Sequence, residues 1–190
     1  MARTQLAKAE RLAAARDKFA AFQKGSYTPA NNDERLDLAE WCKIKKLHHT
    51  ATRLYAAAFA ADPKLADDLK TGHRYNAACF AALATAGQGE DTAKLDDNER
   101  ARLRHQALDW LKADLTAWTK LLESGPPQAR PTIVQTLNHW KEDSDLAGVR
   151  DKAALAKLPA EERAACAQLW ADVAALLKKA QVRPTKESKK

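Results

Sequence analysis

One stretch of the sequence, residues 35–63, constrains the fold more than any other. It reads RLDLAEWCKIKKLHHTATRLYAAAFAADP, and small residues recur in it at Ala39, Ala51 and Ala58. Small side chains on facing helices let two antiparallel backbones approach closely, and the larger Tyr55 fills the space beside them. The stretch therefore predicts a closely packed helix hairpin.

This hairpin resembles the tetratricopeptide repeat (TPR), a two-helix unit that recurs about every 34 residues. The matching positions are Leu38, Ala39, Ala51, Tyr55, Ala58 and Pro63. Pro63 has no backbone N–H and therefore ends the second helix. Two positions depart from the pattern, because Ala39 replaces the usual Gly and Cys42 replaces the usual aromatic residue.

A second unit begins at residues 73–87, HRYNAACFAALATAG, where Asn76, Ala77 and Ala78 occupy the equivalent places. A polar insert follows it and delays its partner helix to about residues 107–111. We predict TPR-like pairs at about 33–63 and 72–123 in a single domain over 1–180, followed by a disordered basic tail over 181–190. Helices outside the pairs would cap this short solenoid.

The composition favours helices throughout the chain. Ala and Leu dominate the apolar residues and both are strong helix formers, whereas Gly and β-branched residues are scarce. Spacing and end signals predict about seven helices, over residues 3–24, 33–46, 49–61, 65 or 73 to 85, 96 or 97 to 123, 126 or 127 to 141, and 159–180. Asp33 is predicted to cap the second helix and Pro159 to open the last. The predicted fold class is all-α, with TPR-like antiparallel helix pairs and flanking capping helices.

The net charge of +7 is concentrated at the two ends of the chain. Residues 1–24 carry +4 and residues 178–190 carry +5, so residues 25–177 carry −2. A protein that binds nucleic acid needs positive charge on its folded face. This distribution therefore argues against a nucleic-acid partner.

The cysteines and histidines, which are the residue types that often bind metals, are scattered along the chain, and structural or solvated roles explain them. The cysteines, Cys42, Cys79 and Cys166, form no CxxC pair and are expected to be small buried residues. His48 and His49 are adjacent, so they point to different sides of a helix, and no HExxH motif occurs. Solvated or capping roles are also expected for His73, His105 and His139. We predict no metal and no cofactor.

The other polar clusters also favour structural roles. GQGED, residues 87–91, is not a GxGxxG motif, and its acidic residues would repel phosphate, so it predicts a turn. Acidic residues that have basic neighbours three or four positions away predict a solvated, salt-bridged helix face. They are Asp96, Asp97, Glu99, Asp109 and Asp114. We predict no catalytic residue in this chain.

A family resemblance covers residues 33–180. The run over residues 59–127, with HWKEDSDLAGVRD and LPAEERAACAQLWADVAALLKKA after it, looks like the C-terminal TPR region of serine/threonine protein kinases of planctomycete bacteria. The resemblance implies a module that binds proteins and is associated with a kinase domain. The chain itself contains no Gly-rich phosphate loop, VAIK-like strand, HRD or DFG, so kinase activity is not implied for it.

The predicted function is therefore non-catalytic binding of a protein or peptide. In a TPR-like unit the first helix of each pair lines the concave face, which predicts binding residues Glu40, Lys43, Ile44, Tyr75, Asn76 and Cys79. Asn76 has two candidate roles, bonding a peptide backbone or bridging turns inside the scaffold. The alternatives for the whole chain are a structural spacer or dimerisation segment of a larger protein, and an enzyme of unrecognised type.

The expected compartment follows from what the sequence lacks. It contains no apolar run of about 18 residues and no secretory signal, so we expect no membrane insertion by this chain. A cytoplasmic location is expected, with the outer side of a membrane-anchored kinase as the alternative.

Overall fold

The computed structural model describes the backbone of residues 2–182 and the side chains of residues 10–182. Every regular element in that part is a helix and none is a strand, which confirms the predicted all-α class. The chain forms two compact units, residues 1–110 and residues 111–190, here named the N-terminal and C-terminal units. The boundary falls within the predicted pair at 72–123, and the TPR-like pairing stays a prediction.

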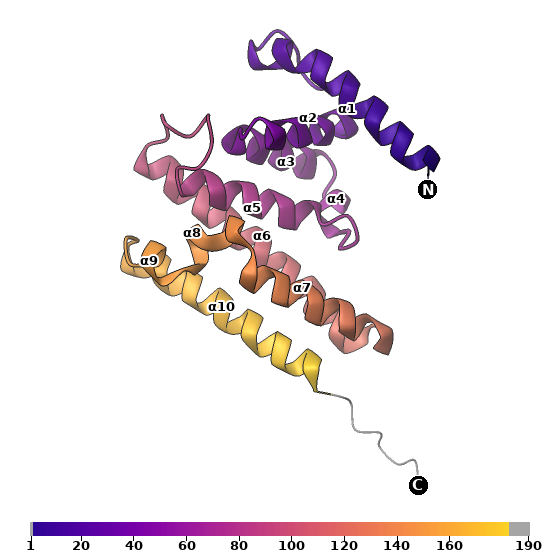
Figure 1. Cartoon of the computed structure of the whole chain (residues 1–190). Coiled ribbons are helices and arrows are strands. Elements are labelled where there is room, and N and C mark those ends of the chain that lie inside the picture. Colours follow the sequence, from indigo (N-terminus) through magenta and orange to yellow (C-terminus); the bar gives the residue numbers. More distant parts are fainter. Residues whose placement is uncertain (1, 183–190) are drawn as a thin grey trace. The chain divides into compact units, whose positions relative to one another are not determined.

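The N-terminal unit holds five complete helices and the first half of a sixth. They are α1 (Ala2–Gln23), α2 (Asn32–Ile44), α3 (His48–Ala61), α4 (Lys64–Asp67), α5 (His73–Thr85) and α6 (Asp97–Ser124). Helix α2 packs against both α1 and α3, and α3 packs against α5, so successive helices lie side by side (Figure 1). The hairpin expected at residues 35–63 is therefore present as α2 and α3.

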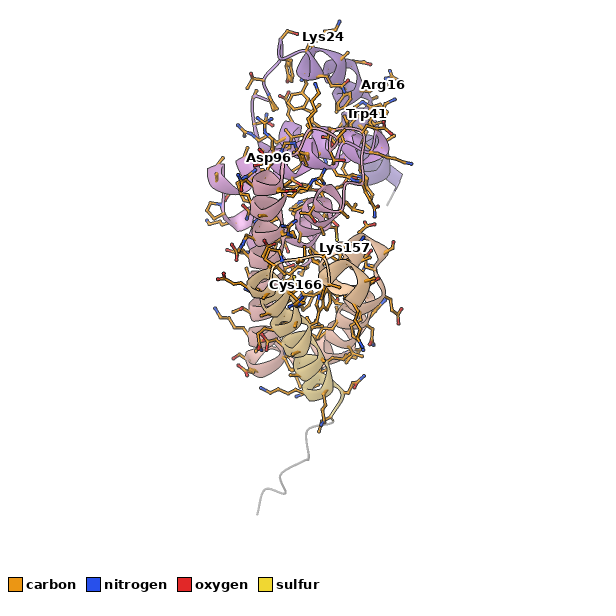
Figure 2. The ribbon with its side chains drawn as sticks, turned by 90° about the vertical axis from the view of Figure 1, so that its left-hand side faces the viewer. Arg16, Lys24, Trp41, Asp96, Lys157 and Cys166 are labelled. Atoms are coloured by element: carbon orange, nitrogen blue, oxygen red, sulfur yellow. The ribbon has the colours of Figure 1, made fainter. Side chains whose placement is uncertain are left out.

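The core of the N-terminal unit combines small residues with aromatic rings. Of the residues assigned to the TPR-like pattern, Leu38, Ala39, Ala51, Tyr55 and Ala58 are buried. Tyr55 stacks on Phe80 of α5 with ring centroids 5.9 Å apart. At the α1–α2 contact, the rings of Phe19 and Trp41 meet edge to face at 6.4 Å. Figure 2 labels Trp41. Aromatic side chains thus fill the spaces that the alanines leave between the helices.

The C-terminal unit is built from the second half of α6 and the elements that follow it. They are the 3₁₀ turn η1 (Pro127–Ala129), α7 (Arg130–Glu142), the 3₁₀ turn η2 (Ser144–Leu146), α8 (Ala147–Arg150), α9 (Lys152–Leu155) and α10 (Ala160–Gln181). Helices α7 and α10 pack against each other, and Figure 2 labels Cys166 on α10. Large aliphatic residues dominate this core, among them Ile133, Leu137, Leu169 and Val173.

Several predicted helix ends are wrong by a few residues. Helix α2 begins at Asn32, and its cap is Asn31 instead of Asp33, because the Asn31 side chain accepts a bond from the backbone N–H of Glu34 at 2.9 Å. Pro159 precedes α10 as its cap residue and does not open the helix. The sequence alone does not fix the cap residue, because any of the three residues in the run Asn31-Asn32-Asp33 can place a side-chain oxygen at the helix end.

Of the two starts predicted for the fourth helix, residues 65 and 73, the structure shows the second. A single short turn of helix, α4, ends at Asp67, and α5 begins separately at His73 after Gly72, whose φ is +65°. A left-handed backbone at this position is one that glycine adopts without strain. In the predicted tail, Gln181 belongs to α10, and residues 183–190 lie outside the described residues. No helix among the described residues combines the length and the apolar character that crossing a bilayer requires.

Candidate functional site

The predicted binding residues on α2 differ in exposure. Glu40 is half-buried in the second half of the helix. Lys43 and Ile44 are exposed at its end, and Ile44 keeps 58% of its surface open to solvent. Ile44 and Val182 are the two large hydrophobic residues that are exposed among residues 10–182. The end of α2 therefore offers an apolar side chain that the scaffold does not use.

The predicted binding residues on α5 lie deeper. Tyr75 and Asn76 are half-buried, and Cys79 is buried at 5% exposure. The side chain of Asn76 hydrogen-bonds to the hydroxyl of Tyr55 on α3. Of the two roles expected for Asn76, the structure therefore shows a bond within the scaffold. Part of the Asn76 surface remains open to solvent, so this bond does not close the site.

Side chains of α2 and α5 both influence the hydroxyl of Tyr55 on α3. The Tyr55 side chain is 1% exposed, and burial is the largest cause that raises its pKa above the usual range. The negative charge of Glu40 on α2 raises this pKa further, whereas the bond from Asn76 on α5 lowers it. Glu40 and Asn76, which were predicted to share one face, thus act on the same hydroxyl.

His73 belongs to the same group, and the sequence-based interpretation of it as a solvated or capping residue is wrong. The ring lies 6.1 Å from the Tyr55 ring, and its Nδ1 is buried without a hydrogen-bond partner. Burial lowers the pKa of His73, opposed by the charges of Glu40 and Asp68. The signal in the sequence was the spacing of three between His73 and Asn76, which places both on one helix face.

These four residues are named the Tyr55 cluster: Glu40, Tyr55, His73 and Asn76. Within residues 10–182, Glu40 forms no hydrogen bond and no ion pair. The cluster therefore combines one half-buried carboxylate of α2 with neutral polar groups of α3 and α5.

The Gly-rich stretch forms turns, as predicted, and its residue Asp91 also fixes it against α3. Asp91 accepts bonds from the backbone N–H groups of His49 and Thr50, at 3.2 and 2.8 Å, and so caps the start of α3. Nδ1 of His48 lies 2.9 Å from the carbonyl oxygen of Gln88 and donates to it. His48 and Asp91 are thus committed to fixing the insert against α3.

The acidic face of α6 is salt-bridged at its start. Glu99 binds Arg102 with contacts of 2.8 and 2.6 Å, and Nε2 of His49 lies 3.2 Å from the Glu99 carboxylate. The bond from Arg102 is the largest cause that lowers the pKa of Glu99, to about 2. Asp96 has a different role, because its side chain accepts the N–H of Glu99 and caps the helix. Asp114 is 3% exposed, so its expected place on a solvated face is wrong.

The cysteines are buried, as expected. Cys42 and Cys166 are fully buried, and none of the three cysteines forms a disulfide. Burial raises the pKa of the Cys42 thiol to about 12. A thiol that stays protonated at neutral pH is a poor nucleophile and a poor metal ligand.

A cavity of about 180 Å³ lies between α1 and α2, and sequence reasoning did not anticipate it. Basic residues of α1 and acidic residues of α2 line it together. Arg11 pairs with Asp37 at 3.4 Å, and Lys18 pairs with Glu34 at 2.5 Å. Four of its charged groups, Arg11, Lys18, Glu34 and Asp37, therefore already have partners within the scaffold.

Comparison with family models, curated proteins and solved structures yields no match to this chain. The assignment of a function therefore rests on the residues and their geometry.

Proposed function

We propose that the chain is a non-catalytic helical scaffold that binds a protein or peptide on the face formed by α2 and α5. The observation that carries this proposal is that the charge of Glu40 and the hydrogen bond of Asn76 both act on the hydroxyl of Tyr55. These two residues come from different helices, and the TPR-like pattern assigned both to the binding face. A groove that holds an extended peptide needs polar groups from neighbouring helices at one place.

The other residues that could take part in catalysis or ligand binding instead support a scaffold role. Asp91 and His48 are occupied by bonds that fix the insert, and Glu99 is held by Arg102. Nucleophilic catalysis needs an activated group beside a base, and the Cys42 thiol is instead kept protonated by burial. Binding is the function that leaves each of these arrangements intact.

We further propose that the chain serves as a module associated with a serine/threonine kinase. This part of the proposal rests on the sequence resemblance over residues 33–180. A scaffold of this kind would bring a substrate or regulator close to the kinase. The effective concentration of that substrate or regulator at the kinase domain would then rise.

A peptide selection tests the binding function without knowledge of the natural partner. The purified chain is used as bait for a display library of random peptides, and the affinities of enriched peptides are measured by fluorescence polarisation. The face variant Lys43→Glu/Ile44→Ser changes two exposed residues of α2. The control variant Lys157→Glu/Val182→Ser makes the same charge reversal and a similar replacement of an aliphatic residue by serine at exposed positions of the C-terminal unit.

The proposal predicts that enriched peptides lose about tenfold or more in affinity for the face variant and bind the control variant as they bind the wild type. Both variants should retain the wild-type melting temperature, since the altered side chains are exposed. Failure to enrich any peptide, or equal affinity for the two variants, contradicts the proposal.

A further inference from the structure

We propose that the end of α2 binds an acidic segment of the partner, one in which an aliphatic residue lies between carboxylates. This inference rests on the proposed binding function and names the chemistry that the face recognises. The surface is formed by four consecutive exposed residues, Lys43, Ile44, Lys45 and Lys46, which are named the α2 corner. Within residues 10–182 its lysine side chains form no ion pair and no hydrogen bond, and residues 1–9 contain no Asp or Glu.

The backbone at Lys46 holds a lysine in a place that favours glycine. The helices α1, α2 and α5 end in the same motif, in which one left-handed residue and the residue after it donate to carbonyls three and five positions earlier. That residue is Gly25 after α1 and Gly87 after α5, at φ +72° and +73°, but Lys46 after α2, at +53°. A side chain in this conformation costs free energy that glycine avoids. Such local strain is typical of functional positions.

The helix dipole does not account for this difference between the three helix ends. A cation near a helix C-terminus is favourable, yet the last turns of α1 and α5 contain no basic residue. Nor does the dipole explain Ile44, which is 58% exposed between the lysines. Positive charge around an apolar side chain complements carboxylates around an aliphatic one.

Two other anionic partners fit the α2 corner less well. Binding at a membrane surface buries the whole apolar face of an amphipathic helix, whereas the corner offers one aliphatic side chain, Ile44. A phosphate backbone would pair with the lysines but offers Ile44 no apolar contact. An acidic protein segment uses both features.

The polar insert holds the corner in a fixed position. The backbone N–H of Glu90 donates to the carbonyl of Lys46 at 2.9 Å, and a Cβ added at Gly89 would lie 2.7 Å from that oxygen. A corner that is already ordered loses little freedom on binding. Glu40, one turn before Lys43, and Glu90 form no ion pair with the corner within residues 10–182. Carboxylates of a partner therefore meet no competing ion pair there.

Defined peptides with blocked ends test the corner separately from the library. The labelled chain is titrated with Asp-Glu-Leu-Glu-Asp while its NMR spectrum is followed. Asn-Gln-Leu-Gln-Asn lacks the charges, and Asp-Glu-Ser-Glu-Asp lacks the aliphatic residue. The corner variant, Lys45→Gln/Lys46→Gly, changes positions that the face variant leaves intact. The control variant, Lys152→Gln/Lys157→Gln, removes two exposed charges from the C-terminal unit.

The inference predicts that the acidic leucine peptide shifts the amide signals of residues 43–46. Its affinity falls about fivefold or more in the corner variant, stays unchanged in the control variant, and decreases as salt is added. The other two peptides bind the wild type more weakly. Lys46→Gly alone keeps or raises the melting temperature, whereas Gly25→Lys lowers it, because the first change removes a left-handed side chain and the second creates one.

Equal binding of the three peptides, no shifts at residues 43–46, or unchanged affinity in the corner variant would overturn the inference. Tighter binding of the corner to oligothymidylate or to phosphatidylserine vesicles than to the acidic peptide would also overturn it. A lower melting temperature in Lys46→Gly would assign the lysine a structural role instead.

These outcomes differ from a failure of the proposed function. If library peptides lose affinity for the face variant but carry no acidic residues, the scaffold function stands and the inference fails. If the library enriches no peptide, or only peptides that bind the face variant and its control equally, the proposed function itself fails.

Discussion

The two units of this chain build their cores from different residues. In the N-terminal unit, alanines such as Ala39 and Ala51 are fully buried between helices, and aromatic rings fill the gaps. In the C-terminal unit, branched aliphatic residues such as Ile133 and Leu137 occupy the fully buried positions. Alanine faces permit close helix approach, so polar side chains at the rims of α2 and α5 can meet at one tyrosine. The contrast teaches that the small-residue hairpin creates the convergent site.

The two units end their helices by a shared device. In the N-terminal unit, the guanidinium of Arg100 binds the carbonyl oxygens of Ala84 and Thr85 at the end of α5. In the C-terminal unit, Arg150 binds the carbonyls of Trp140 and Asp143 at the end of α7. Arginine suits this role because its donors bind several unpaired carbonyls at once. Its positive charge also interacts favourably with the negative end of the helix dipole.

The largest expected effect concerns the aliphatic core of the C-terminal unit. Leu137 is 0% exposed on α7, and Leu137→Ala should reduce the free energy of unfolding by about 2–5 kcal/mol through lost burial and a new cavity. Leu121→Ala, at a half-buried position of α6, is the matched control and should have a smaller effect. Urea unfolding followed by circular dichroism measures both. Equal losses for the two variants would show that α7 does not carry the core.

The opposite substitution tests the alanine core of the N-terminal unit. Ala51 is fully buried on α3, so Ala51→Leu should destabilise by about 1–3 kcal/mol because the added atoms force α3 away from its neighbours. Ala57→Leu introduces the same side chain at an exposed position of α3 and should change the stability little. The same unfolding measurement separates them. A stabilised Ala51→Leu variant would mean that the helices leave room between them.

The cap that the insert provides should have an intermediate effect. Asp91→Ala removes the acceptor for the first N–H groups of α3 and should cost about 1–2 kcal/mol. Glu90→Ala is the control, since Glu90 holds the insert through its backbone N–H, which donates to the carbonyl of Lys46 at 2.9 Å. Hydrogen exchange at the His49 and Thr50 amides should accelerate in Asp91→Ala alone. Unchanged exchange there would contradict the capping role.

The smallest expected effect is a pH dependence at the α1–α2 contact. Bonds from Lys18, Tyr27 and the Ala30 N–H lower the pKa of Glu34 from about 4.5 to about 2. The unfolded state therefore binds the proton more readily, and this contribution to stability is complete above about pH 4.5 and is lost as the pH falls toward 2. Glu34→Gln should flatten the dependence of stability on pH in this window, and Glu10→Gln should not. An unchanged slope in Glu34→Gln would place the acid sensitivity elsewhere.

Local sequence signals predicted much of this fold. Helical spacing gave α3 and α10 to within a few residues, and the small residues of the hairpin predicted the burial of Ala39, Ala51 and Ala58. These features depend on residues a few positions apart in the sequence, and the helical periodicity of apolar residues reveals such local relations. The composition likewise predicted an all-α chain, because few residues in it favour strands.

The long-range contacts could not be predicted in this way. Asp91 caps a helix that starts more than 40 residues earlier, and nothing near Asp91 in the sequence points to His49 or Thr50. The group around Tyr55 has the same origin, because it needs α2, α3 and α5 to be packed before Glu40 and His73 share a neighbourhood. The helical pattern therefore predicted half of the candidate site, and the other half arises from tertiary packing that the sequence does not show.

The most direct test of the central claim is an NMR map of the chain with a peptide selected from the library. The account predicts that signals of Glu40, Asn76 and Ile44 shift together, and that Lys43→Glu/Ile44→Ser weakens the peptide without lowering the melting temperature. A peptide that shifts signals only in the C-terminal unit, or that binds this variant as tightly as the wild type, would contradict the assignment of the binding face to α2 and α5.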